Sequence, residues 1–135
     1  MRLTVAAAGT ATPATVWDRY THPDRWPDWS PQIRSVDCAD DVIRTGTTGV
    51  VHGPCGAAVN FEVLDVDHET RCWSWRVKAV GIELILGHRV DARGRPADSG
   101  TRTTLTITGP APIVVGYLPL ARVAMGRLVR LPACP

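Results

Sequence analysis

The chain has 135 residues, of which 44% are hydrophobic and 21% charged, so we expect one globular domain over residues 1–135 and no extended disorder. A net charge of +2 without a clustered basic stripe argues against nucleic-acid binding. The longest apolar stretch, Ala111 to Ala121, is too short to span a bilayer, so stable membrane insertion is not expected.

The four cysteines include no Cys-x-x-Cys pair. No signal-peptide pattern precedes the first alternating segment. We therefore expect a cytoplasmic protein with free thiols rather than a disulfide framework.

The first third of the chain predicts one strand and two short helices. Residues 2–7 alternate apolar and polar positions, which indicates a strand with one mostly buried face. Thr12-Pro13 then combines an N-cap residue with proline at the first helical position, and a similar signal precedes Pro23. Pro27 and Pro31 end the second helix, because proline cannot continue it.

From residue 33 onward the apolar residues recur at every second position. This period predicts six further strands, over residues 33–38, 46–53, 57–66, 71–80, 83–91 and 101–108, with a Gly/Pro/Asp loop over 93–100. Parallel pairing needs long crossover connections, which these segments lack. The sheet should therefore be antiparallel and mostly a meander.

Residues 113–131 predict a final helix that is apolar on nearly all sides, with Pro119 expected to kink or break it. The fold class is thus α+β: a curved antiparallel sheet of about seven strands, two short helices after the first strand, and a long C-terminal helix packed across the sheet. Because a twisted sheet curves away from a straight helix, this arrangement leaves room for an apolar cavity between them.

The alternation predicts which side chains line that cavity. The inner face should carry Phe61, Trp73, Trp75, Leu84, Leu86 and His88. His88 is the best candidate for a catalytic acid or base and for a ligand hydrogen bond. The structural alternative is a core histidine that is hydrogen-bonded to a neighbour's backbone. Trp29, like Trp26, should stand at the cavity mouth or anchor a short helix, and Tyr117 should point either inward or to solvent.

A pattern of histidines and cysteines imitates a zinc finger. His52 and Cys55 are followed by His68 and Cys72 at finger-like spacing. A finger needs its second pair one helical turn apart, whereas residues 68–72 are typical of a turn entering a strand. We therefore predict no metal site, and no cofactor is expected.

Several short motifs resemble a known group of proteins. Val16-Trp17, followed by the segment His22-Pro23-Asp24-Arg25-Trp26-Pro27-Asp28-Trp29-Ser30-Pro31, is similar to the opening signature of the polyketide cyclase/dehydrase and lipid-transport superfamily. Gly46-Thr47, Ser74-Trp75 and Gly100-Thr101-Arg102 also fall where that pattern puts them. The resemblance covers nearly the whole chain and implies the START-like, pollen-allergen-like helix-grip fold. Pro119 and the early stop at residues 131–135 depart from the pattern.

The resemblance implies function only broadly, because its members include cyclases, carriers and receptors. Our first hypothesis is a protein that binds a hydrophobic small molecule, such as a lipid, a quinone or a polyketide-like compound. The alternatives are an aromatase/cyclase-type enzyme acting on a polyketide-like substrate and a regulatory or protein-interaction module. The sequence is compatible with a monomer or a homodimer.

Overall fold

The computed structural model describes residues 1–93 and 100–130. In these ranges one antiparallel sheet of seven strands has the order β1-β7-β6-β5-β4-β3-β2. The strands are β1 (Arg2–Gly9), β2 (Ser35–Cys38), β3 (Thr48–His52), β4 (Ala58–Asp67), β5 (Cys72–Ala79), β6 (Ile82–Ala92) and β7 (Thr101–Thr108). The predicted meander is confirmed, and β1 completes the sheet beside β7. The predicted loop at 93–100 lies mostly outside the described residues.

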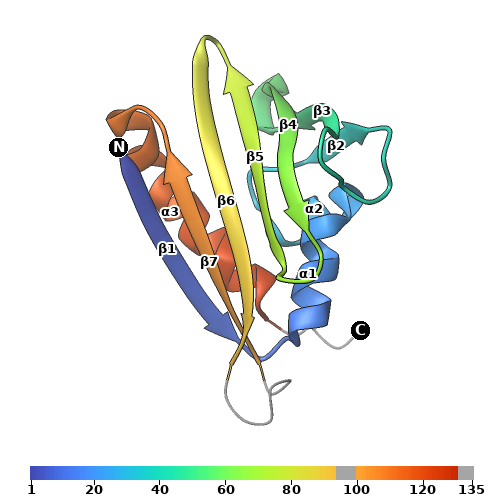
Figure 1. Cartoon of the computed structure of the whole chain (residues 1–135). Coiled ribbons are helices and arrows are strands. Elements are labelled where there is room, and N and C mark those ends of the chain that lie inside the picture. The colour runs from blue at the N-terminus through green and yellow to red at the C-terminus, as the bar shows by residue number, and fades with distance from the viewer. Residues whose placement is uncertain (94–99, 131–135) are drawn as a thin grey trace.

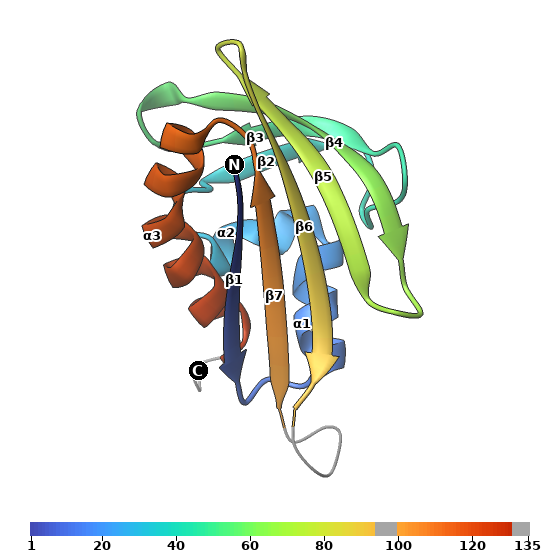
Figure 2. The ribbon, with the colours of Figure 1, turned by 60° about the vertical axis from the view of Figure 1, so that its left-hand side comes forward.

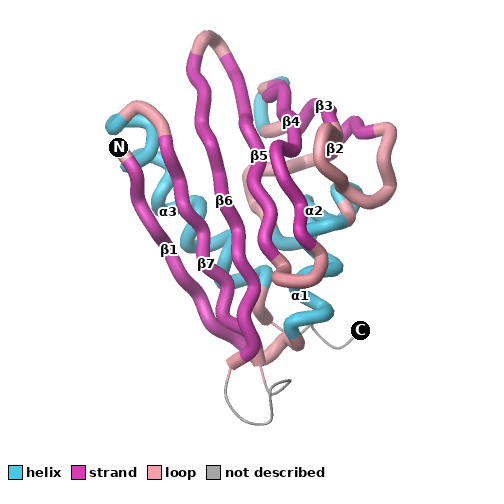
Figure 3. Tube along the Cα trace, in the orientation of Figure 1, coloured by secondary structure: helices cyan, strands magenta, loops and turns pink. Residues whose placement is uncertain are grey.

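The helices lie on one side of the sheet, which curves around them (Figures 1 and 2). They are α1 (Pro13–Thr21), the 3₁₀ turn η1 (Pro23–Arg25), α2 (Trp26–Trp29), the 3₁₀ turn η2 (Pro54–Gly56) and α3 (Ala111–Leu128). In Figure 3, α3 passes behind β7 and β6. The predicted α+β class is therefore confirmed, and η2 is an addition that the sequence pattern did not indicate.

The predicted helix starts have a clear local cause. Thr12 adopts an extended conformation, and its side-chain oxygen accepts the backbone N–H of Thr15 at 3.2 Å, which satisfies one free donor of α1. Val16 and Tyr20, one helical turn apart, are both fully buried against the sheet. The extended backbone of His22 then separates α1 from the next turn.

The alternation of β5 and β6 directs their large side chains to the inner face. Trp75 pairs with Leu86 and Trp73 pairs with His88 across the two strands, and all four side chains are buried. A register shift in β4 between Val63 and Asp65 marks a β-bulge, which increases local twist. This curvature separates the centre of the sheet from α3.

The last helix continues through Pro119 without a break, so the expected interruption is not seen. Proline removes one backbone donor, but the helix is held by buried residues on its inner face: Val114, Ala121, Ala124, Met125 and Leu128. It ends at Leu128, three residues before the predicted end. Its outer face leaves Val115, Leu120 and Val123 exposed, so the helix is apolar on both sides.

One residue of the β5–β6 turn has an unfavourable conformation. Val80 lies at φ 53°, beside Gly81 at φ 76°, and its side chain is 99% exposed. A β-branched residue in the left-handed region costs about 1–2 kcal/mol, whereas Asn-Gly is favoured in such two-residue turns.

We predict that Val80→Asn raises the free energy of unfolding by about 1 kcal/mol, measured by urea denaturation. Val42→Asn, at an exposed valine outside the left-handed region, should give no such gain; equal effects of the two changes would contradict the prediction.

Candidate functional site

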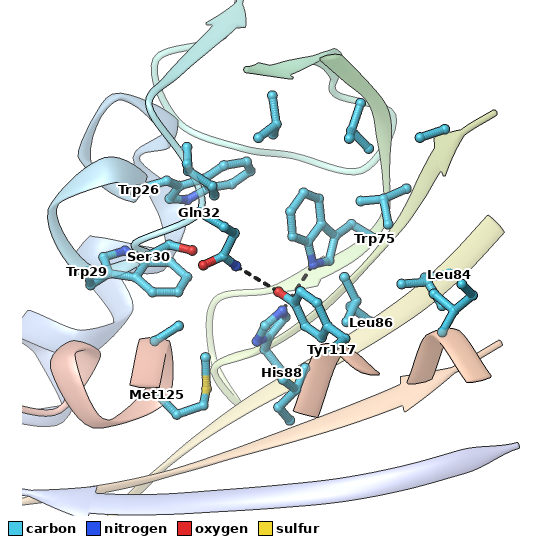
Figure 4. Close-up of a pocket in the computed structure, with 18 of the residues that line it drawn as sticks. Trp26, Trp29, Ser30, Gln32, Trp75, Leu84, Leu86, His88, Tyr117 and Met125 are labelled. Carbon is cyan, nitrogen blue, oxygen red and sulfur yellow. Dashed lines mark hydrogen bonds between the residues drawn. The ribbon is translucent and has the colours of Figure 1, made fainter. Parts of the chain in front are cut away.

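An apolar cavity of about 310 Å³ lies between the inner face of the sheet and α3 (Figure 4). This volume is at the lower end of the range for small-molecule sites. Its described lining includes no Asp, Glu, Lys or Arg. Eight residues singled out from the sequence lie in this lining: Trp26, Trp29, Trp73, Trp75, Leu84, Leu86, His88 and Tyr117. The sheet and helix thus border a concave space whose described lining has no charged side chains.

Phe61 is the one inner-face residue from that prediction that is not part of the lining. Its ring packs 5.4 Å from the ring of Trp26 and 5.6 Å from that of Trp75, measured between centroids. Phe61 therefore supports two lining residues from behind and has no direct surface on the cavity.

Three tryptophans form one side of the cavity, which we call the aromatic wall (Trp26, Trp73 and Trp75). Their ring centroids are 5.8, 5.3 and 5.0 Å apart for the pairs 26–73, 73–75 and 26–75. Trp26 Nε1 donates to the carbonyl of Tyr20 at 2.9 Å, which fixes the orientation of its ring. Such mutual contacts are worth more than area burial alone, so the wall is a rigid surface.

A chain of hydrogen bonds holds the aromatic wall to the rest of the core. Trp75 Nε1 donates to His88 Nε2 at 3.0 Å. Because this places the acceptor at Nε2, the ring hydrogen lies on Nδ1, which faces the Tyr20 hydroxyl at 3.1 Å. The Tyr20 hydroxyl lies 2.7 Å from Thr103 Oγ1. The Thr103 hydroxyl donates in turn to the carbonyl of Arg89 at 3.1 Å. Both nitrogens of His88 are thus engaged inside the protein.

Burial determines the protonation of this chain. Desolvation lowers the pKa of His88 from 6.5 to about 3 and raises the pKa of Tyr20 well above its ordinary value. Protonation of Nε2 would also make it a donor, and it would then face a second donor, the Trp75 N–H. The imidazole is therefore neutral at physiological pH.

A second polar contact spans the cavity from the loop after α2 to α3. Gln32 Nε2 donates to the Tyr117 hydroxyl at 2.9 Å (Figure 4). Of the two orientations open to Tyr117, the structure shows the inward one. Gln32 and the buried Ser30 also line the cavity. Sequence reasoning missed both, because they lie in an irregular segment without periodicity.

The two histidines of the zinc-finger-like pattern each contact another side chain. His52 Nε2 lies 2.6 Å from Asp37 Oδ2, and Trp17 Nε1 donates to His68 Nδ1 at 3.1 Å. Within residues 1–93 and 100–130, no cluster of three or more His, Cys, Asp or Glu side chains is placed to hold a metal ion. Cys38 and Cys72 are free thiols.

A family model described as polyketide cyclase/dehydrase and lipid transport matches residues 2–131. The chain belongs to this family. Among proteins with curated descriptions, none matches the sequence. Membership of the polyketide cyclase/dehydrase and lipid transport family confirms the resemblance that the tryptophan- and proline-rich segment indicated.

Solved structures with the same fold are distant in sequence. The protein XoxI from Bacillus cereus has a TM-score of 0.78 at 13% identity, with 95% of this chain and 92% of that one covered. Ara h 8.0201 has a TM-score of 0.69 at 12% identity, covering 95% and 94%. The di-domain ARO/CYC BexL from the BE-7585A biosynthetic pathway has a TM-score of 0.77 at 13% identity, covering 96% and 45%, so this chain spans less than half of BexL. These similarities establish the helix-grip fold of the family member described here.

Within residues 1–93 and 100–130, we find no helix whose length and apolarity would allow it to cross a membrane. This agrees with the short apolar stretch noted in the sequence.

The neutral state of His88 makes stability dependent on pH. The unfolded chain takes up this proton near pH 6.5, whereas the folded protein does so only near pH 3. The free energy of unfolding should therefore fall as pH drops through that window, by on the order of 1 kcal/mol per pH unit. We predict a shallower pH dependence for His88→Gln, whose amide can accept from Trp75 and donate to Tyr20, when unfolding is measured between pH 4 and 7. Identical slopes for the two proteins would contradict this account of His88.

Proposed function

We propose that this protein binds a hydrophobic small molecule in the cavity between the aromatic wall and α3. The observation that carries the proposal is a concave space of about 310 Å³ whose described lining has no charged side chain. Small-molecule sites are typically such concave apolar spaces with few polar groups. Membership of a family described as polyketide cyclase/dehydrase and lipid transport supports the same function.

The energy available to such a ligand is considerable. A two-ring aromatic group buries about 150–250 Å². At about 25 cal/mol per Å² of apolar surface, this burial contributes about 4–6 kcal/mol, which is offset in part by the cost of immobilising the ligand. The cavity therefore favours a compact, rigid molecule over a long flexible chain.

The alternative to binding alone is an aromatase/cyclase-type reaction. In such a reaction His88 would act as the acid or base. Its two ring nitrogens contact Trp75 and Tyr20, and burial lowers its pKa to about 3. Neither nitrogen has a free position for a substrate proton, and the neutral ring is a poor general acid. We infer that His88 positions Trp75 in the aromatic wall, and binding is the function that the geometry supports best.

The proposed function predicts that filling the cavity abolishes binding. Ala124 is buried in the lining on α3, whereas the neighbouring Val123 faces outward and is 48% exposed. Naphthalene should bind the unmodified protein, as measured by saturation-transfer NMR. Ala124→Phe should weaken this binding at least tenfold, because the added ring occupies the ligand's space, while Val123→Phe should retain it. Circular dichroism establishes that both variants are folded. Unchanged binding to the Ala124→Phe variant, or no binding to the unmodified protein, would overturn the proposal.

A further inference from the structure

The polar groups of the cavity gather where the loop after α2 faces α3. Ser30 and Gln32 come from that loop, and Tyr117 comes from the helix (Figure 4). His88 is the further polar side chain of the lining, and its nitrogens are engaged with Trp75 and Tyr20. Trp73 Nε1 is also buried in the lining without a partner among the described residues, but an indole nitrogen can only donate. Side chains that can both donate to and accept from a guest are therefore found in the remaining three residues, which we call the polar end (Ser30, Gln32 and Tyr117).

The polar end is incompletely satisfied. Gln32 Nε2 donates to the Tyr117 oxygen, but Gln32 Oε1 is buried without a partner among the described residues. The Tyr117 hydroxyl accepts this bond, and its own hydrogen has no acceptor among the described residues. An amide carries both donor and acceptor groups, so either orientation of Gln32 leaves one polar atom unpaired. Buried polar atoms are normally paired, so this end is prepared for a ligand group that both donates and accepts.

The cavity offers no partner for a charged ligand. The described lining has no basic side chain that could neutralise a carboxylate or phosphate, and no acidic one that could neutralise an amine. Burying an unpaired charge is far more costly than burying a hydroxyl group. Burial raises the pKa of Tyr117, so its hydroxyl keeps its proton and remains a donor.

The shape of the space favours a flat guest. The aromatic wall supplies three indoles, and Trp29 contributes a fourth buried indole to the lining. Aromatic rings pack against one another in stacked or edge-to-face arrangements, which a flat ring system can join.

We propose that the cavity selects an uncharged, flat, mainly apolar molecule with a hydroxyl group that hydrogen-bonds to the Gln32–Tyr117 pair, and that it excludes organic anions. This inference deepens the proposed function and rests on it. It assigns ligand selectivity to two residues, Gln32 and Tyr117, that lie outside the aromatic wall.

The test compares four compounds of one ring size at pH 7.5 by isothermal titration calorimetry: 2-naphthol, 2-methoxynaphthalene, naphthalene and 2-naphthoate. The unmodified protein should bind 2-naphthol about five- to tenfold more tightly than naphthalene, as expected for one net hydrogen bond. The methoxy compound, which accepts but cannot donate, should fall between them. The carboxylate should bind at least a hundredfold more weakly than 2-naphthol.

Two variants locate the source of this selectivity. Tyr117→Phe and Gln32→Met remove the polar groups with little change in size, and each should bring the affinity ratio of 2-naphthol to naphthalene close to one. Val123→Phe, on the outer face of α3, is the matched control and should keep the ratio of the unmodified protein.

The outcomes separate this inference from the proposed function. Naphthalene binding as tightly as 2-naphthol, or tight binding of 2-naphthoate, would overturn the selectivity while leaving the binding function intact. A ratio that persists in both Tyr117→Phe and Gln32→Met would equally overturn it. Failure of all four compounds to bind would overturn the proposed function together with this inference.

Discussion

The hydrogen bonds that run from Trp75 through His88 and Tyr20 to Thr103 join four elements of the fold: β5, β6, α1 and β7. Each donor in this chain meets an acceptor only while His88 is neutral, and burial keeps it so. A buried polar network of this kind fixes the positions of its members. Trp75 is thereby held in the aromatic wall instead of turning into the space beneath α3.

The cavity follows from this constraint and from the shape of the sheet. The bulge in β4 and the twist of the strands curve the sheet away from α3, which spans it as a continuous helix. The aromatic side chains that could have filled the space are held against one another instead. What remains is an apolar volume with uncharged polar groups facing its interior, and this combination is the basis of the binding function that we propose.

Much of this architecture could be predicted from the sequence, because strand alternation and helix caps are local signals. The period of two in β5 and β6 placed Trp73, Trp75, Leu86 and His88 on one face, as the structure confirms. The Gln32–Tyr117 contact could not be foreseen, since it joins an irregular loop to a helix 85 residues away. The role of Tyr20 was equally hidden, because a buried tyrosine on an amphipathic helix has no sequence signal for its hydroxyl partner. Pro119 was expected to kink or break α3, and the helix is unbroken because it packs along its inner face.

The central claim is that the space beneath α3 is hollow and accessible, and xenon tests it most directly. Xenon enters apolar cavities without needing any hydrogen bond, so it reports on space independently of ligand chemistry. A crystal of the protein pressurised with xenon should show the gas between Trp75, Leu86 and Met125, with the Trp75–His88 hydrogen bond intact. Side chains closed over that position, with no xenon bound there, would contradict the account.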